Sequence, residues 1–149
     1  MSELSIQAPL DPAAVKRVLI IRPRFVGDVC LTMPVVDHLR RHAPGAVLDY
    51  LVEESYAPLV QGDPRLGRVV VARRNRSPLD AGRLLVNLAR ARYDLVLDLF
   101  CNPRTAIWTA ATKAAVRVGY PDKGWRSERY NRFVRPTQKS AIAFHLNSI

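Results

Sequence analysis

The chain has 149 residues, of which 48% are hydrophobic and 24% charged, and its formal net charge is +10. This length fits one domain with a real core, and the composition excludes disorder over the whole chain. No apolar run approaches the roughly 20 residues of a membrane-spanning helix, no secretory signal is visible, and two distant cysteines exclude a disulfide framework, so we expect a cytoplasmic protein.

Residues 1–14 are expected to form a loose N-terminal arm. Short β-branched apolar runs then predict five strands, at 16–22, 46–52, 68–72, 95–100 and 116–118. Helical spacing of apolar residues, with caps and stops, predicts intervening helices at 29–43, 54–60, 80–92 and 105–113. Pro34 predicts a kink in the first helix, or a helix that begins near Met33. The part after residue 120 shows the least regular pattern.

Strand and helix alternate at least four times, and the strands are continuously apolar rather than alternating. This pattern predicts the α/β class, with a doubly wound, mainly parallel, Rossmann-like sheet covered on both faces. Ligands of such sheets bind at the carboxyl ends of the strands.

The first strand-to-helix turn carries the strongest local signal, because Arg22, Arg24, Gly27 and Asp28 follow the strand directly. Gly27 permits close backbone approach or a positive φ, and free N–H groups at the next helix start can hold an anion. The turn matches neither a dinucleotide fingerprint nor a P-loop. Asp28 is either the N-cap of a helix starting at Val29 or a general base at the mouth of the sheet.

The fourth strand ends in a second polar group, formed by Asp98, Cys101, Asn102 and Arg104. This group is expected to face the same crevice as Asp28. The alternative is structural: Asn102 caps a helix, and Asp98 is a buried carboxylate with its hydrogen bonds satisfied.

Histidines 38 and 42 lie one helical turn apart, but no third ligand is near, so a surface pair is favoured and no metal site is expected. Cys30 is expected to be a small buried hydrophobe and Trp108 a core residue.

The positive charge is concentrated in the second part of the chain. Residues 1–67 hold 7 basic and 8 acidic residues, whereas residues 68–149 hold 16 basic and 5 acidic ones. The excess indicates either a polyanionic partner or ordinary solvated faces. After residue 120, aromatic residues alternate with arginines, which also suits nucleic acid or a sugar phosphate.

Several blocks together resemble the lipopolysaccharide heptosyltransferases of glycosyltransferase family 9. They are residues 18–60 with the G-D-V-x-x-T-x-P stretch of 27–34, the segment RYDLVLDLFCNPRTA at 92–106, VGY at 118–120 and YNRFV at 130–134. The resemblance implies a GT-B architecture of two Rossmann-like domains facing across a cleft. Residues 15–149 would be the N-terminal, acceptor-side domain, ending near His145, and the C-terminal donor-binding domain would be absent from this chain.

The resemblance also implies a reaction. Asp28 would be the general base of an inverting sugar transfer that needs no covalent intermediate, metal or cofactor. The donor would be a nucleotide-sugar of the ADP-heptose type, held mostly by the other domain, and the acceptor an anionic glycolipid such as the lipopolysaccharide core. Family members often carry small hydroxyl residues before the Gly-Asp pair, whereas residues 24–26 of this chain are Arg-Phe-Val.

The residues expected to contact substrate are Arg22, Arg24, Gly27, Arg73, Arg74, Asn102, Arg104 and Arg126. The expected place of action is the cytoplasm, with peripheral contact to the inner face of the cytoplasmic membrane. The alternatives are a basic nucleic-acid-binding α/β module and an inactive truncated remnant. Carboxylates at strand ends would repel phosphate and argue against nucleic acid as a partner.

Overall fold

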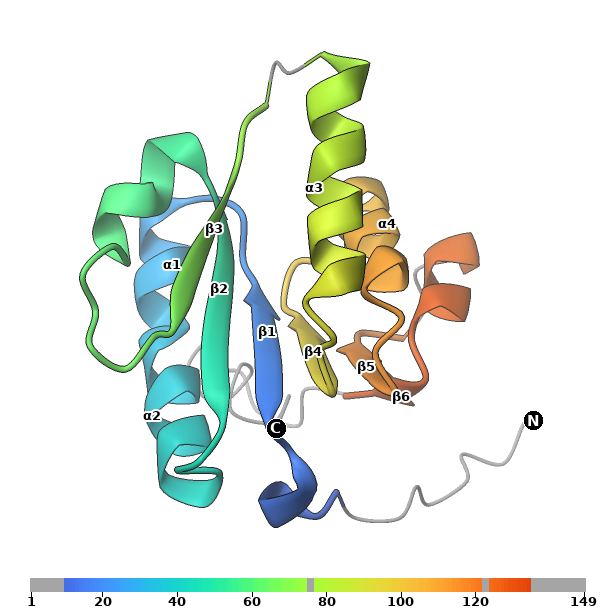
Figure 1. Ribbon diagram of the computed structural model, residues 1–149. Coiled ribbons are helices and arrows are strands. Elements are labelled where there is room, and N and C mark those ends of the chain that lie inside the picture. Colours follow the sequence, from blue (N-terminus) through green and yellow to red (C-terminus); the bar gives the residue numbers. More distant parts are fainter. Residues whose placement is uncertain (1–9, 75–76, 122–123, 135–149) are drawn as a thin grey trace.

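A computed structural model describes residues 10–74, 77–121 and 124–134. Its centre is one six-stranded parallel sheet in the order β3-β2-β1-β4-β5-β6 (Figure 1). The strands are β1 (Arg17–Ile21), β2 (Val47–Glu53), β3 (Arg68–Ala72), β4 (Leu95–Asp98), β5 (Val116–Gly119) and β6 (Arg132–Phe133). The order runs outward from β1 in both directions, which confirms the predicted doubly wound, Rossmann-like fold.

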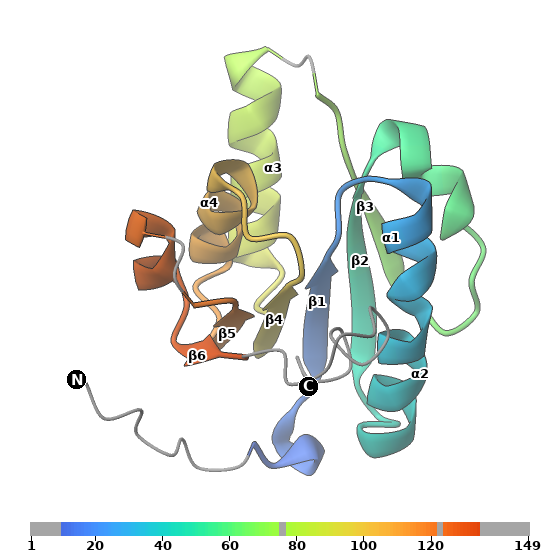
Figure 2. The same cartoon turned by 180° about the vertical axis from the view of Figure 1, so that it is seen from behind.

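Helices cover both faces of this sheet. They are α1 (Val26–Leu31), α2 (Met33–His42), α3 (Pro78–Arg90) and α4 (Pro103–Thr112), with 3-10 turns η1 (Pro12–Ala14), η2 (Glu54–Leu59) and η3 (Gly124–Arg129). Figures 1 and 2 show α1 and α2 on one side and α3 and α4 on the other. None of the helices in these described ranges is long and apolar enough to cross a membrane.

Alternate residues of the strands supply two separate apolar cores. Val18 and Ile20 of β1 pack with the core on the α1 and α2 side, and Leu19 and Ile21 pack with the core on the α3 and α4 side. All four side chains are fully buried. Trp108 lies in the second core, as predicted. Burial on both faces explains why these strands read as continuous apolar runs.

The first helical segment differs from its predicted bounds. It is two helices that break at Thr32, and α1 starts at Val26 rather than at Val29. Pro34 therefore lies in the first turn of α2, where its missing N–H would have no intrahelical partner. The prediction of a helix that begins near Met33 is confirmed, and the start at Val29 is wrong.

Two other predictions need correction. Residues 10–14 of the expected loose arm are ordered: Asp11 caps η1, and Leu10 packs against the core, because that edge of the apolar face needs cover. The sixth strand β6 was missed, since two residues carry too short a pattern to recognise. The rest of the arm and His145 lie outside the described residues.

Candidate functional site

The candidate site lies where the carboxyl ends of β1 and β4 meet. Strand β1 pairs with β2 on one side and with β4 on the other. The loops that follow β1 and β4 therefore start side by side at this edge of the sheet, and they lead to helices on opposite faces. The backbone N–H of Leu99 donates to the carbonyl of Ile21 (3.0 Å), and the rings of Phe25 and Phe100 lie 6.4 Å apart. These contacts bring the β1–α1 loop and the β4–α4 loop together at the position where doubly wound sheets bind ligands.

Asp28 is the third residue of α1 and not its cap. The N-cap position is Phe25, which has φ 70° and makes no side-chain cap hydrogen bond. The predicted capping role is therefore wrong, although a carboxylate in the first turn still suits the positive end of the helix. The Asp28 side chain is 35% exposed, and its Oδ2 lies 2.8 Å from Nη2 of Arg22. It is thus a charged group that is held and yet open to a ligand.

Gly27 lies beside this carboxylate, in the first turn of α1. Its φ is not positive, contrary to one expectation; the positive φ of this turn belongs to Phe25. A Cβ built on Gly27 would meet nothing within 4 Å. Apart from its chain neighbours and its own helix, no protein atom of the described residues packs at this position, and close approach of a ligand to the backbone of Gly27 stays a prediction.

Arg22 was expected to contact substrate, but the structure places it on protein groups. Its side chain is 11% exposed. Besides Asp28 it contacts the carbonyl of Leu99, to which Nη1 donates, and the ring of Phe100, with its guanidinium carbon 5.2 Å from the ring centroid.

Glu53, at the end of β2, links two of the expected arginines and was not singled out in the sequence. Its Oε1 lies 3.4 Å from Nη1 of Arg104 and 3.8 Å from Nε of Arg24. Arg104 also donates to the carbonyl of Arg73 (2.8 Å) and lies over the ring of Trp108. Arg104 is therefore a bridge between β2, the β3–α3 loop and α4.

A polar cavity of about 570 Å³ opens beside Glu53. It is lined by Arg24, Phe25, Glu53, Glu54, Ser55, Tyr56, Arg73, Arg74, Ser77 and Asp80. Arg73 forms an exposed ion pair with Glu54 (2.9 Å), and Arg74 is exposed at the rim. The hydroxyls of Ser55 and Tyr56 were not predicted as site residues. They reach the cavity because β2 continues directly into η2, and their position after a strand is the feature of the sequence that could have indicated them.

The polar residues after β4 have structural partners. Asp98 is buried, and its carboxylate accepts N–H groups of Phe100 (3.0 Å) and Cys101 (2.9 Å) and the hydroxyl of Tyr130 (2.6 Å). Burial raises the pKa of Asp98. Asn102 caps α4. The expectation that Asp98 shares a rim with Asp28 is therefore wrong, because satisfied hydrogen bonds keep it inside.

The remaining candidates are spread over the surface. Arg126 donates to the carbonyl of Cys101 (3.0 Å), near α4. Cys30 is exposed, contrary to the expected burial, because it occupies the outer face of α1. The rings of His38 and His42 stack at 4.0 Å. Across the described ranges no group of three or more His, Cys, Asp or Glu could hold a metal ion.

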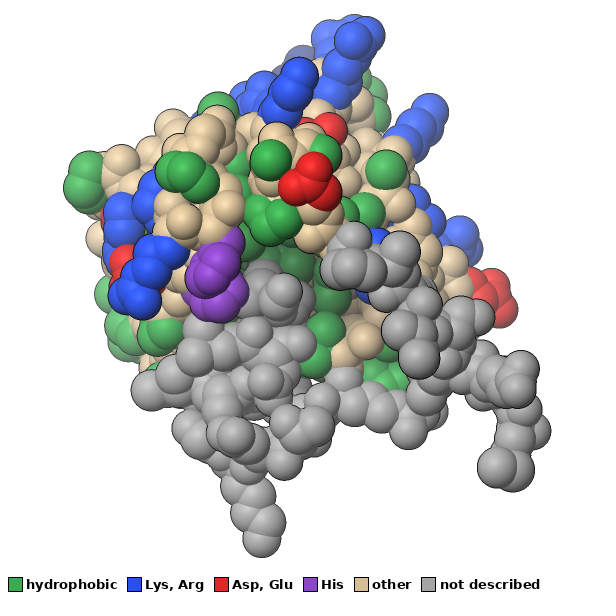
Figure 3. Space-filling model, turned by 90° about the horizontal axis from the view of Figure 1, so that it is seen from below, with side chains coloured by type: hydrophobic (Ala, Val, Ile, Leu, Met, Phe, Trp, Pro, Cys, Tyr) green, Lys and Arg blue, Asp and Glu red, His purple; other side chains and the backbone are tan. Residues whose placement is uncertain are grey.

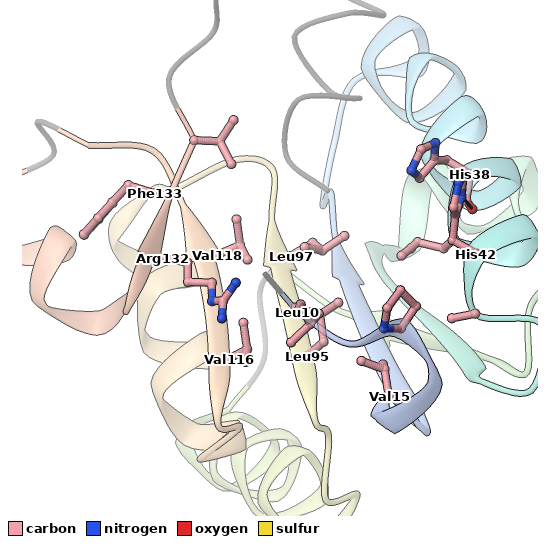
Figure 4. A pocket seen from close by; sticks show the side chains of 14 residues that line it. Leu10, Val15, His38, His42, Leu95, Leu97, Val116, Val118, Arg132 and Phe133 are labelled. Atoms are coloured by element: carbon pink, nitrogen blue, oxygen red, sulfur yellow. Dashed lines mark hydrogen bonds between the residues drawn. The ribbon is translucent and has the colours of Figure 1, made fainter. Parts of the chain in front are cut away.

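An apolar pocket of about 330 Å³ lies toward the opposite edge of the sheet, between α2 and the faces of β4 and β5. Figure 4 shows Leu95, Leu97 and Val118 pointing into it, with both histidines at its rim, and Figure 3 shows the hollow from below. Among the described residues that line it there is no carboxylate, and its titratable side chains are His38, His42 and Arg132.

Known proteins resemble this chain in sequence and in fold. No protein-family model matches it. It is 34% identical over 91 residues to lipopolysaccharide heptosyltransferase 1 of Pseudomonas aeruginosa (55% of this chain, 26% of the relative). It is 25% identical over 132 residues to lipopolysaccharide core heptosyltransferase OpsX of Haemophilus influenzae (85% and 37%). The matches therefore span well under half of these relatives.

Solved structures show the same fold. A family 9 glycosyl transferase from Veillonella parvula matches with a TM-score of 0.80 at 20% identity, over 93% of this chain and 41% of that one. Escherichia coli heptosyltransferase WaaC with ADP-2-deoxy-2-fluoro heptose matches with a TM-score of 0.75 at 23% identity (87% and 46%). The chain is therefore similar in sequence to part of the lipopolysaccharide heptosyltransferases, and it has the fold of a domain of the family 9 glycosyltransferases.

Proposed function

We propose that this domain is the N-terminal, acceptor-side half of an inverting glycosyltransferase. The donor is a nucleotide-sugar of the ADP-heptose type, and the acceptor is an anionic glycolipid such as the lipopolysaccharide core. The enzyme works in the cytoplasm, at the inner face of the cytoplasmic membrane. One observation carries the proposal: Asp28 is partly exposed at the carboxyl edge of the sheet, and its Oδ2 is held by Arg22.

In this reaction Asp28 is the general base. Its free oxygen accepts the proton of the acceptor hydroxyl while that hydroxyl oxygen bonds to the anomeric carbon of the donor. The bond from the anomeric carbon to the diphosphate breaks, and its electron pair leaves with the nucleoside diphosphate. Attack from the opposite face inverts the anomeric configuration. The reacting atoms must be held about 3–3.5 Å apart, which requires a second domain to hold the donor, so this domain alone is expected to be inactive.

The polar cavity beside Glu53 suits the acceptor. Arg24, Arg73 and Arg74 line it and offer guanidinium groups to phosphates or sugar-acid carboxylates. Tyr56 and two serines add hydroxyls for the sugar ring. Glu53, Glu54 and Asp80 line the same cavity, so it presents charges of both signs, which suits a sugar bearing a few charged groups better than the continuous phosphate chain of a nucleic acid.

The test is Asp28→Asn in the complete transferase, meaning this domain together with its donor-binding domain. Because the amide cannot take the proton, kcat is expected to fall by about 10²-fold or more with the fold unchanged. The matched control is Asp37→Asn, since Asp37 also forms a carboxylate–arginine pair, with Arg65 at 2.6 Å, but on α2 away from the site. Near-normal turnover of the Asp28 variant, or an equal loss in both variants, would refute the assignment.

A further inference from the structure

We propose that Arg22 is the positioning residue of Asp28, and that it acts on turnover through this carboxylate rather than by binding substrate. The inference rests on the proposed role of Asp28 as the base. Arg22 follows β1 directly and precedes Asp28 by six residues, so strand and helix are joined through one ion pair across the turn. The turn itself contains Phe25 at φ 70°, a conformation that needs outside support.

Both terminal nitrogens of the Arg22 guanidinium contact protein groups, and its Nε is buried without a hydrogen-bond partner among the described residues. Nη2 pairs with Asp28 at 2.8 Å, Nη1 donates to the carbonyl of Leu99, and the flat face lies over the ring of Phe100. The side chain is 11% exposed, whereas the side chain of Asp28 is 35% exposed. Because Arg22 is nearly buried and both of its terminal nitrogens already contact protein groups, we infer that the more exposed partner, Asp28, is the one that meets substrate.

The anchor under Arg22 is itself fixed. Leu99 N–H donates to the β1 residue Ile21, and the buried carboxylate of Asp98 accepts the N–H groups of Phe100 and Cys101. The backbone N–H of Arg22 in turn donates to Leu51 of β2 (3.2 Å). Three adjacent strands therefore set the place of the guanidinium before any ligand binds.

This arrangement gives Asp28 one fixed oxygen and one free oxygen. The pair with Arg22 engages Oδ2 and limits rotation of the carboxylate, and the 35% exposure of the side chain leaves it accessible to an acceptor hydroxyl. Catalytic groups act well only when they are held within about 0.5 Å of the productive geometry. Losing the anchor should therefore slow the chemical step and leave the binding of both substrates nearly unchanged.

The experiment measures kcat and both KM values in the complete transferase with Arg22→Met, which keeps an unbranched apolar stem and removes the guanidinium. We expect kcat to fall by about 10- to 100-fold and each KM to change by less than about three-fold. Arg22→Lys, which restores a charge without the fork, should recover part of kcat. The double variant Asp28→Asn, Arg22→Met should be about as slow as Asp28→Asn alone, because Arg22 acts through that carboxylate.

The matched control is Arg40→Met. Arg40 is also partly buried and donates to backbone carbonyls, those of Ala46 (2.8 Å) and Arg65, but it lies at the far end of the sheet. Its loss should lower stability and leave kcat within about two-fold. If Arg22→Met fails to fold, Phe100→Leu removes the supporting ring and should lower kcat by about three- to ten-fold with KM unchanged.

Two results would overturn the inference: an unchanged kcat in the folded variants, or a raised KM with normal kcat, which would make Arg22 a substrate ligand. Near-normal turnover of Asp28→Asn would instead refute the proposed base. The two failures are therefore distinguishable.

Discussion

A buried pair of hydroxyls beneath α1 gives a quantitative test of how this part of the fold is held. Thr32 separates α1 from α2, and its Oγ1 donates to the carbonyl of Val29 (2.6 Å) and lies 2.6 Å from the hydroxyl of Tyr50 on β2. Both side chains are fully buried. Thr32→Val keeps the volume of the side chain and deletes its hydroxyl, and Tyr50→Phe deletes the other partner.

The two deletions should have unequal effects. Thr32→Val removes the bond to Val29 and leaves the Tyr50 hydroxyl buried without a partner, so the free energy of unfolding should fall by about 2–4 kcal/mol. Tyr50→Phe leaves Thr32 bonded to Val29 and should lower it by about 0.5–1.5 kcal/mol. The double variant has no orphaned hydroxyl and should lie close to Thr32→Val or above it in stability. A coupling energy of about 1–2 kcal/mol follows.

Urea unfolding followed by far-ultraviolet circular dichroism measures all four proteins. The matched control is a second cycle that uses Thr112 of α4 in place of Thr32. The buried hydroxyl of Thr112 also donates to a carbonyl, that of Thr109 (2.6 Å), but α4 lies on the other face of the sheet. Thr112→Val and Tyr50→Phe should be additive within about 0.3–0.5 kcal/mol. An equal effect of the two single changes, or additivity of Thr32→Val and Tyr50→Phe, would refute the account of the hydroxyl pair.

Two further predictions concern β4 and β5. Gly119→Ala would place a Cβ 2.6 Å from Cγ of Tyr130 and should destabilise the domain by about 1–3 kcal/mol. Gly82→Ala, where a Cβ would meet nothing within 4 Å on α3, should stabilise it by about 0.5–1 kcal/mol. Thermal unfolding measures both changes. The raised pKa of Asp98 means that its contribution to stability is fully present below about pH 3.9 and declines as pH rises through the folded-state pKa. Between pH 4 and 7 the free energy of unfolding of the native chain should therefore decrease relative to that of Asp98→Asn. An increase over this range would contradict the raised pKa.

The strands were predictable because burial on both faces leaves a local pattern. The runs at 46–52, 68–72 and 116–118 lie within one residue of the observed strands. The strand β6 has no such pattern, since it consists of Arg132 and Phe133 and depends on pairing with Val118 and Gly119. An edge strand of two residues is determined by its neighbour and not by its own residues.

The start of α1 could not be predicted for a different reason. Local rules place a positive φ at Gly27 and a cap at Asp28, because glycine adopts that conformation freely and aspartate caps helices well. The structure gives the positive φ to Phe25, a residue with a Cβ, and begins the helix at Val26. The ring of Phe25 lies beside that of Phe100, which is 75 residues further along the chain, and a local sequence pattern cannot predict such a contact.

The candidate site was predictable only in part. The turn after β1 indicated that Arg22 and Asp28 lie close together, but not that they pair. Glu53 and the hydroxyls of η2 follow β2, whose register against β1 determines where they emerge. Sequence reasoning can find polar residues that follow a strand, but which of them meet depends on the order of strands in the sheet.

Two aspartates that look equivalent in the sequence show this most clearly, because each follows an apolar run and precedes a helix. Asp28 lies in the first turn of α1, partly exposed and paired with Arg22. Asp98 is the last residue of β4, and backbone N–H groups and the Tyr130 hydroxyl surround it in the interior. The buried carboxylate fixes the loop that carries Leu99 and Phe100, which in turn support Arg22. The inner aspartate therefore supports the residues that hold the outer one, and the outer one is the aspartate that we propose as the general base.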